Sequence, residues 1–153
     1  MSIANAMSLS QKINKDLTDA VKARDSVRVS CLRMLKSSLK NREKEAGREL
    51  KDEEVQAIVS SSIRKGKESV MEFRKGGRED LAVKEEQEIN IFYEYLPRQL
   101  TPDEVEKSVR EVISDLSAES PKDLGRVMKT AMARMAGQAQ GKEVGEIARK
   151  LLG

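Results

Sequence analysis

Two short stretches of sequence decide the fold, KESVMEFRKGGREDL at residues 67–81 and YLPRQL at residues 95–100. The first ends one helix at the glycine pair Gly76-Gly77 and begins a second helix directly behind it. The second ends that helix before Pro97, whose ring cannot continue it, and opens a new segment. These two breaks divide the chain into two helical groups.

On either side of the breaks, apolar residues recur at helical spacing between clear start and stop signals. Ser8 and Gln11 have the spacing of a capping box, and Thr101 to Glu104, TPDE, is the strongest helix start in the chain. No alternating β-branched run predicts a strand. The predicted helices span about residues 9–23, 26–46, 52–74, 78–95, 102–116, 121–136 and 142–152.

The pattern therefore predicts an all-α protein with a disordered leader at residues 1–8. An N-terminal four-helix unit is expected at residues 9–96 and a small three-helix C-terminal unit at residues 97–153. Gly66 lies on the apolar stripe of its helix, where glycine costs about 1 kcal/mol relative to alanine. Its position predicts that another helix approaches closely there.

Composition excludes several kinds of site. The 153 residues carry a net charge of +3, contain no histidine and have one cysteine, Cys31. An internal disulfide, a multi-cysteine metal site and the usual histidine base are therefore excluded, and we expect neither a metal nor a cofactor. No apolar run approaches the roughly 20 residues of a membrane span, and residues 1–8 do not resemble a signal peptide. We expect no membrane association and a cytoplasmic location.

Glu85 and Glu88 lie on the inner side of the helix predicted at residues 78–95. Their spacing suits an acid–base couple or a divalent-ion site, but also an ion pair that fixes helix register. We favour structural ion pairs, with Arg78 among the candidate partners. Cys31 is mid-helix near an apolar face and is expected to fill the core. The serine run at residues 60–62 is expected to face solvent or to pack.

Two basic surfaces can bind phosphate. On the helix at residues 26–46, four cations share the side opposite the apolar face: Arg33, Lys36, Lys40 and Lys44. These cations are candidates for contact with a phosphate backbone, but they can also form a solvated face. On the helix at residues 121–136, Lys122, Arg126 and Lys129 share a side near a small-residue loop at residues 137–141. Lys142 begins the next helix, and amides at a helix start favour anions. Because acidic residues lie close by, a phosphate site and a solvated face both remain open.

The order and spacing of six segments resemble a stand-alone member of the GatB/YqeY family, from Leu9 to the end of the chain. The segments are LRML at 32–35, DEEV at 52–55, GREDLA at 77–82, YLPRQL at 95–100, KDLGRVM at 122–128 and GQAQGK at 137–142. The resemblance implies an all-helical protein in two parts. It also implies a likeness to the helical tail of the B subunit of the tRNA-dependent amidotransferase, which contacts tRNA.

Carried over to this sequence, the resemblance places seven residues near RNA: Lys122, Gly125, Arg126, Lys129, Gly137, Gly141 and Lys142. One position departs from the pattern, because Gln140 stands where the resemblance predicts an acid. An amide keeps a loop hydrogen bond but carries no charge, so a role that needs the carboxylate does not transfer.

Three functional hypotheses follow. The first is a non-catalytic helical adaptor that binds tRNA or a tRNA-charging, amidotransferase-type assembly. The second is a protein–protein interaction module that does not contact RNA, because residues 101–153 hold nine basic and nine acidic residues and no aromatic platform for bases. The third, implied by the resemblance alone, is carbon–nitrogen ligase activity with glutamine as amido-N-donor. We find no recognisable catalytic residues for it and expect no catalysis by the isolated chain.

Overall fold

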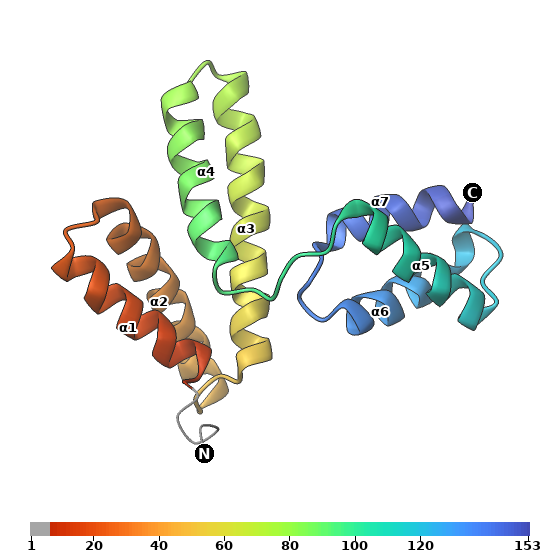
Figure 1. The fold of residues 1–153 in the computed structure, drawn as a ribbon, viewed down its shortest axis with the longest axis horizontal. Helices are drawn as coiled ribbons and strands as arrows, with labels where there is room; N and C mark the ends of the chain where they lie inside the picture. The colour runs from red at the N-terminus through yellow and green to blue at the C-terminus, as the bar shows by residue number, and fades with distance from the viewer. Residues whose placement is uncertain (1–6) are drawn as a thin grey trace. The chain divides into compact units, whose positions relative to one another are not determined.

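The computed structural model describes residues 7–153, and within that range it contains seven α-helices, one 3-10 turn and no strand. The all-α prediction is confirmed (Figure 1). The helices are α1 (Leu9–Lys22), α2 (Ser26–Ala46), α3 (Asp52–Lys75), α4 (Glu79–Tyr93), α5 (Pro102–Leu116), α6 (Leu124–Met135) and α7 (Gly141–Leu152), with the 3-10 turn η2 (Pro121–Asp123) before α6. None of these helices is long and apolar enough to cross a bilayer.

The chain divides between Tyr95 and Leu96 into two compact units. Unit 1 contains α1 to α4, and unit 2, Leu96–Gly153, contains α5, η2, α6 and α7. The leader predicted at residues 1–8 lies outside the described residues except for Met7 and Ser8, and Ser8 caps α1.

The helix ends follow local capping chemistry. The Ser8 hydroxyl accepts a hydrogen bond from the Gln11 amide at 3.1 Å, and the Gln11 side chain accepts one from the Ser8 amide at 3.0 Å. Thr101 and Glu104 form the same reciprocal pair at the start of α5. Both predicted capping boxes are confirmed, and each satisfies amides that a helix start leaves unpaired.

The start of α6 differs from the prediction. The predicted helix at residues 121–136 begins instead with the separate turn η2, and α6 starts at Leu124. The Ser120 hydroxyl accepts from the Lys122 amide at 3.3 Å, while the Asp123 carboxylate accepts from the Glu119 amide at 3.0 Å. These bonds hold the segment in a tight turn, because both side chains bond to backbone close by instead of capping a regular α-helix.

Unit 1 consists of two helical hairpins, α1–α2 and α3–α4, which pack together through α2 and α4 and through α1 and α3 (Figure 1). The contact between α3 and α4 is the most extensive. A Cβ atom placed on Gly66 of α3 would lie 2.9 Å from Cγ1 of Ile89 on α4. The predicted close approach at Gly66 is confirmed, since no larger residue fits there without a shift of Ile89.

Polar side chains tie the end of α4 to the first hairpin. The buried Tyr95 donates its hydroxyl to the Asp16 carboxylate at 2.6 Å, and Asp16 also accepts from the Lys12 ammonium at 3.1 Å. Arg28 donates two hydrogen bonds to Glu94, at 2.9 and 3.0 Å. These contacts hold residues just before the unit boundary against α1 and α2.

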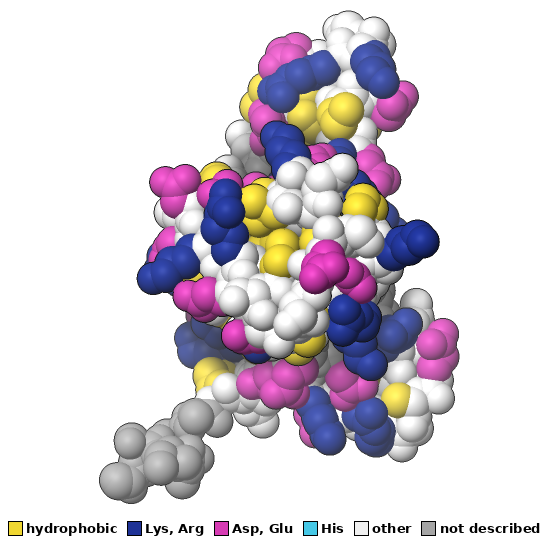
Figure 2. Space-filling model, turned by 90° about the vertical axis from the view of Figure 1, so that its right-hand side faces the viewer, with side chains coloured by type: hydrophobic (Ala, Val, Ile, Leu, Met, Phe, Trp, Pro, Cys, Tyr) yellow, Lys and Arg dark blue, Asp and Glu magenta, His cyan; other side chains and the backbone are white. Residues whose placement is uncertain are grey.

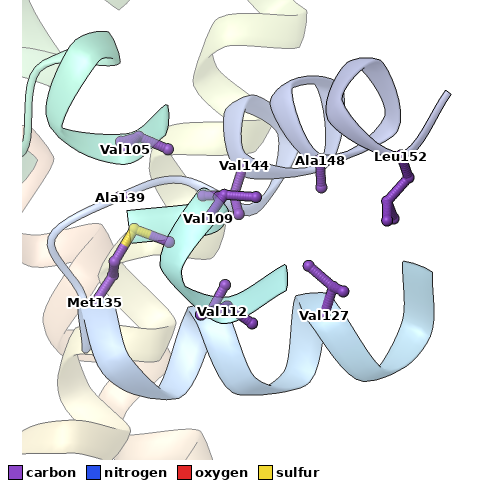
Figure 3. Packing of buried hydrophobic residues seen from close by; sticks show 10 residues of the cluster. Val105, Val109, Val112, Val127, Met135, Ala139, Val144, Ala148 and Leu152 are labelled. Carbon is purple, nitrogen blue, oxygen red and sulfur yellow. The ribbon is translucent and has the colours of Figure 1, made fainter. Parts of the chain in front are cut away.

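Unit 2 encloses a core of small apolar side chains, which Figure 3 shows pointing inward from all three helices. The core residues are Val105, Val109 and Val112 of α5, Val127, Ala131 and Met135 of α6, Ala139 of the α6–α7 loop, and Val144, Ala148 and Leu152 of α7. Valine and alanine fill little space, so the three helices pack closely and the charged side chains remain on the outer faces.

Candidate nucleic-acid interface

The residues predicted to contact RNA lie along the α6–α7 hairpin, in two groups. A Cβ atom on Gly141 would lie 4.0 Å from the Met132 methyl, and one on Gly145 would lie 3.8 Å from the Met128 methyl. The helices are therefore antiparallel, with the end of α6 beside the start of α7. A twelve-residue helix is about 18 Å long, which separates the first turn of α6 from the loop that follows it.

Lys122, Gly125 and Arg126 belong to the group at the first turn of α6, whereas Gly137, Gly141 and Lys142 belong to the group at the α6–α7 loop. Lys129 lies between the groups on the exposed side of α6. From the sequence, Lys122, Arg126 and Lys129 were expected near this loop. The structure instead distributes them along the hairpin, because a loop of a few residues reverses the chain only after α6 has run its full length.

The cations of this surface differ in their partners. The Arg126 guanidinium donates to the Asp123 carboxylate at 3.0 Å, and the pKa of Asp123 is lowered by the bond from the Glu119 amide and then by Arg126. Lys122, Lys129 and Lys142 are exposed and form no ion pair with any residue that the structure describes. These three lysines are therefore the cations most available to a ligand.

The start of α7 leaves its first-turn amides without a side-chain cap. Gln140 occupies the N-cap position and makes no capping bond, although Gly141 and Lys142 after it are exposed. The Gln140 side chain is buried instead, and its Nε2 atom has no hydrogen-bond partner among residues 7–153. An aspartate here would accept a bond from these amides. Because Gln140 replaces the expected acid and does not cap the helix, the first-turn amides of α7 stay free to donate hydrogen bonds beside Lys142.

The α6–α7 loop is held by the segment that leads into unit 2. Gln99 donates its side-chain amide to the Gly137 carbonyl at 2.8 Å, and the Leu100 amide donates to the Gln138 carbonyl at 2.8 Å. Residues 95–100 were predicted as a helix break and as part of the resemblance, but the positioning role of Gln99 was not predicted. The signal was present, because YLPRQL and GQAQGK both belong to the segments that carry the resemblance.

The surface around this hairpin is mixed in charge. In Figure 2, basic and acidic side chains alternate over the visible face without forming a continuous basic area. Arg134 of α6 is paired with Asp115 of α5 at 2.8 Å. On this face, an anion would therefore contact particular lysines and amides, because the basic side chains do not form one continuous area (Figure 2).

A family model described as "Yqey-like protein" matches residues 10–152, almost the whole chain. The chain belongs to the YqeY-like family. This bears out the resemblance, and the six segments that carry it lie within the matched range.

Relatives of this YqeY-like chain include "Altered inheritance of mitochondria protein 41, mitochondrial" from two yeasts. The protein of Vanderwaltozyma polyspora is 35% identical over 107 residues, which cover 68% of this chain and 58% of the relative. That of Lachancea thermotolerans is 33% identical over 112 residues, covering 71% and 60%. The YqeY-like chain thus matches about three fifths of the length of these relatives. Their names place them in mitochondria, and the cytoplasmic location remains a prediction for this chain.

The second basic surface lies in unit 1 of the YqeY-like chain, on α2. Its residues, Arg33, Lys36, Lys40 and Lys44, are exposed or half-buried. None of them forms an ion pair within the described part of the chain. Residues 26–42 contain no aspartate or glutamate at all. Arg33, Lys36 and Lys40 therefore have no acidic neighbour along α2 before Glu43, whereas Lys44 lies between Glu43 and Glu45.

The expected ion pairs of Glu85 and Glu88 are not those that form. Arg78 pairs with Asp80 at 3.1 Å, since the neighbouring carboxylate is within reach and Glu85 lies two helical turns away. Burial and then the proximity of Glu88 raise the pKa of Glu85. Among residues 7–153, neither glutamate has a salt-bridge partner.

Cys31 is buried, as predicted for a core residue. Its thiol donates to the Glu88 carbonyl at 3.7 Å, and burial followed by the charge of Glu88 raises its pKa to about 12. The thiol is therefore protonated at neutral pH, and a protonated thiol is a poor nucleophile.

Proposed function

We propose that this protein is a non-catalytic helical adaptor that binds RNA of the tRNA class through the α6–α7 hairpin. The observation that carries the proposal is the start of α7, where uncapped amides lie beside the exposed Lys142. Phosphate groups bind well to such a helix start, because the amides donate hydrogen bonds and the helix dipole is positive there. Lys129 and Lys122 continue the cationic track along α6.

The choice of tRNA rests on family membership together with the resemblance to the amidotransferase tail. Unit 2 has no aromatic residue within α5, α6 or α7 on which a base can stack. Contact would therefore be made to phosphates and to the shape of a folded RNA, which suits a structured RNA better than a single strand.

A protein–protein module without RNA contact remains the second candidate. The pairing of Arg126 with Asp123 and of Arg134 with Asp115 favours it, because these bonds reduce the positive charge available on unit 2. Glutamine-dependent carbon–nitrogen ligation has no such support, since the only thiol is protonated in the core.

Fluorescence-anisotropy titration with labelled bulk tRNA at about 50 and 200 mM salt tests the proposal. With three lysine–phosphate contacts, affinity is expected to fall by roughly tenfold or more between these salt concentrations. The double variant Lys129→Glu, Lys142→Glu is expected to lose about tenfold or more in affinity, equivalent to about 1.4 kcal/mol.

The matched control is Lys65→Glu, Lys107→Glu, which changes the net charge equally on exposed positions of α3 and α5, away from the α6–α7 hairpin. Equal losses in both double variants would show that only net charge matters and would defeat the site. No salt-dependent binding by the unaltered protein would favour the protein–protein candidate.

A further inference from the structure

A shallow groove of about 600 Å³ lies in unit 1 between the end of α1 and the first half of α2. Val21, Val29 and Met34 form its apolar part, and Arg24 and Arg33 are its charged residues. We refer to it as the α1–α2 groove. It is distinct from the α6–α7 hairpin, because all of its residues belong to unit 1.

The apolar side chains of the α1–α2 groove are unusually open to solvent. Met34 is 62% exposed and Val21 is 49% exposed. The other exposed large apolar residues of the described chain, Met7, Met71 and Val83, do not line this groove. Single exposed apolar residues are ordinary, but two that line one groove indicate a contact surface.

The charged residues that line the α1–α2 groove are all basic. Arg24 and Arg33 form no ion pair within residues 7–153, and no carboxylate lines the groove. Asp25, which follows Arg24 in the sequence, is bound by Arg28, which also binds Glu94. A partner that fills this groove must therefore bring its own negative charge.

The turn between α1 and α2 holds Arg24 in a left-handed conformation, with φ of 58°. The Arg24 amide donates to the Val21 carbonyl at 3.2 Å, and the Asp25 amide donates to the Ala20 carbonyl at 3.0 Å. These bonds fix the backbone at one end of the groove. The position of Arg24 there is thus set by the fold of the turn.

We propose that the α1–α2 groove binds an acidic amphipathic helix of a partner protein. Such a helix presents apolar residues at spacings of three and four, which would cover Val21 and Met34. Its flanking carboxylates would accept paired hydrogen bonds from the guanidinium groups of Arg24 and Arg33. A nucleic acid fits less well, because phosphates gain nothing from apolar side chains and the groove offers no aromatic ring for a base.

This inference does not depend on RNA binding by unit 2. The probe is a fluorescein-labelled 18-residue designed helix with leucines along one face and glutamates on both flanks. Anisotropy measures its affinity, and 15N–1H NMR of the full chain locates its contact. Binding is expected to shift the amide signals of Val21, Arg24, Arg33 and Met34. The same helix with lysine in place of glutamate is expected not to bind.

Met34→Glu and Arg33→Glu are each expected to weaken binding by about tenfold or more. Met71→Glu is the matched control, because Met71 is 52% exposed on α3 and lies outside the groove. The unit 2 variant Lys129→Glu, Lys142→Glu is expected to bind the peptide unchanged, which separates this site from the RNA site. Circular dichroism checks that each variant keeps its helices.

Three results would overturn the proposal. The first is no shift of groove signals at millimolar peptide, and the second is equal affinity for the Met34→Glu and Met71→Glu proteins. The third is that tRNA shifts the amide signals of the groove residues while the acidic helix does not, which would make the groove a nucleic-acid contact.

Discussion

Unit 1 and unit 2 each enclose an apolar core, but they differ in the side chains that form it and in the polar contacts around it. In unit 1, residues far apart in the sequence are joined by charged and polar side chains, as in Tyr95 with Asp16 and Arg28 with Glu94. The apolar core of unit 2 consists mostly of valine and alanine, with Gln140 as a buried polar residue beside it in the sequence. Both units use a cation to join helices, as in Arg28 with Glu94 and Arg134 with Asp115. In unit 2, Lys122, Lys129 and Lys142 form no ion pair in the described structure.

The substitution with the largest expected effect tests whether the cores of unit 1 and unit 2 unfold independently. Val109→Asp places a carboxylate in the centre of the unit 2 core, where Val109 is fully buried. An uncompensated buried charge costs about 3–5 kcal/mol, and a unit of about 60 residues has a stability of similar size. We expect unit 2 to unfold while the NMR signals of unit 1 keep their dispersion.

Val83→Asp is the control for this experiment, because the same substitution then falls on a valine of α4 that is largely exposed. It is expected to leave both units folded. Loss of unit 1 signals in the Val109→Asp protein would mean that the two cores are not separate.

The next effect concerns the polar contacts of unit 1. Tyr95→Phe removes the hydroxyl bonded to Asp16 and is expected to cost about 1–2 kcal/mol of unfolding free energy, measured by urea denaturation. Burial alone would raise the pKa of Asp16, but the bonds from Tyr95 and Lys12 lower it. The pKa of Asp16 should therefore rise in the variant. Tyr93→Phe, which removes no hydrogen bond identified within residues 7–153, should change neither quantity.

Local signals in the sequence predicted much of this fold. The capping pairs at Ser8 and Thr101 act within four residues, and Gly66 on an apolar stripe has few explanations besides a close helix contact. The bond between Tyr95 and Asp16 was not foreseen, because it joins residues 79 positions apart and depends on how four helices pack. The spread of site residues along the α6–α7 hairpin was missed for a related reason, since sequence proximity to a loop is not spatial proximity.

Two helical glycines, Gly125 in unit 2 and Gly66 in unit 1, differ in how closely other atoms pack against them. In α6, a Cβ atom on Gly125 would have no heavy atom within 4 Å, so Gly125→Ala is expected to stabilise unit 2 by about 0.5–1 kcal/mol. In α3, Gly66→Ala gains the same stabilisation from reduced backbone freedom of the unfolded chain, but the new methyl group forces Ile89 to move. We expect the two substitutions to differ by about 1 kcal/mol or more in thermal unfolding, and equal gains would show that the α3–α4 contact is loose.

The smallest effect concerns Glu85, whose pKa is raised by burial and by Glu88. Because the folded-state pKa lies above the unfolded value, the protonated form is favoured by folding, and this stabilisation is lost as pH rises through the folded-state pKa. Glu85→Gln is therefore expected to stabilise unit 1 at pH 7, by less than about 1 kcal/mol since the side chain is only half-buried and solvent screens part of its charge. The gain should shrink as pH falls through the folded-state pKa and disappear well below the ordinary glutamate pKa of about 4.3, where Glu85 is protonated in both the folded and the unfolded state. Glu86→Gln is the matched control on the same helix: Glu86 binds Arg74 at 2.8 Å, so its loss should destabilise slightly. Thermal unfolding of the three proteins between about pH 4 and pH 7 measures these differences in stability. A Glu85→Gln protein that is less stable than the unaltered protein at pH 7 would mean that the charge of Glu85 has a partner in solution.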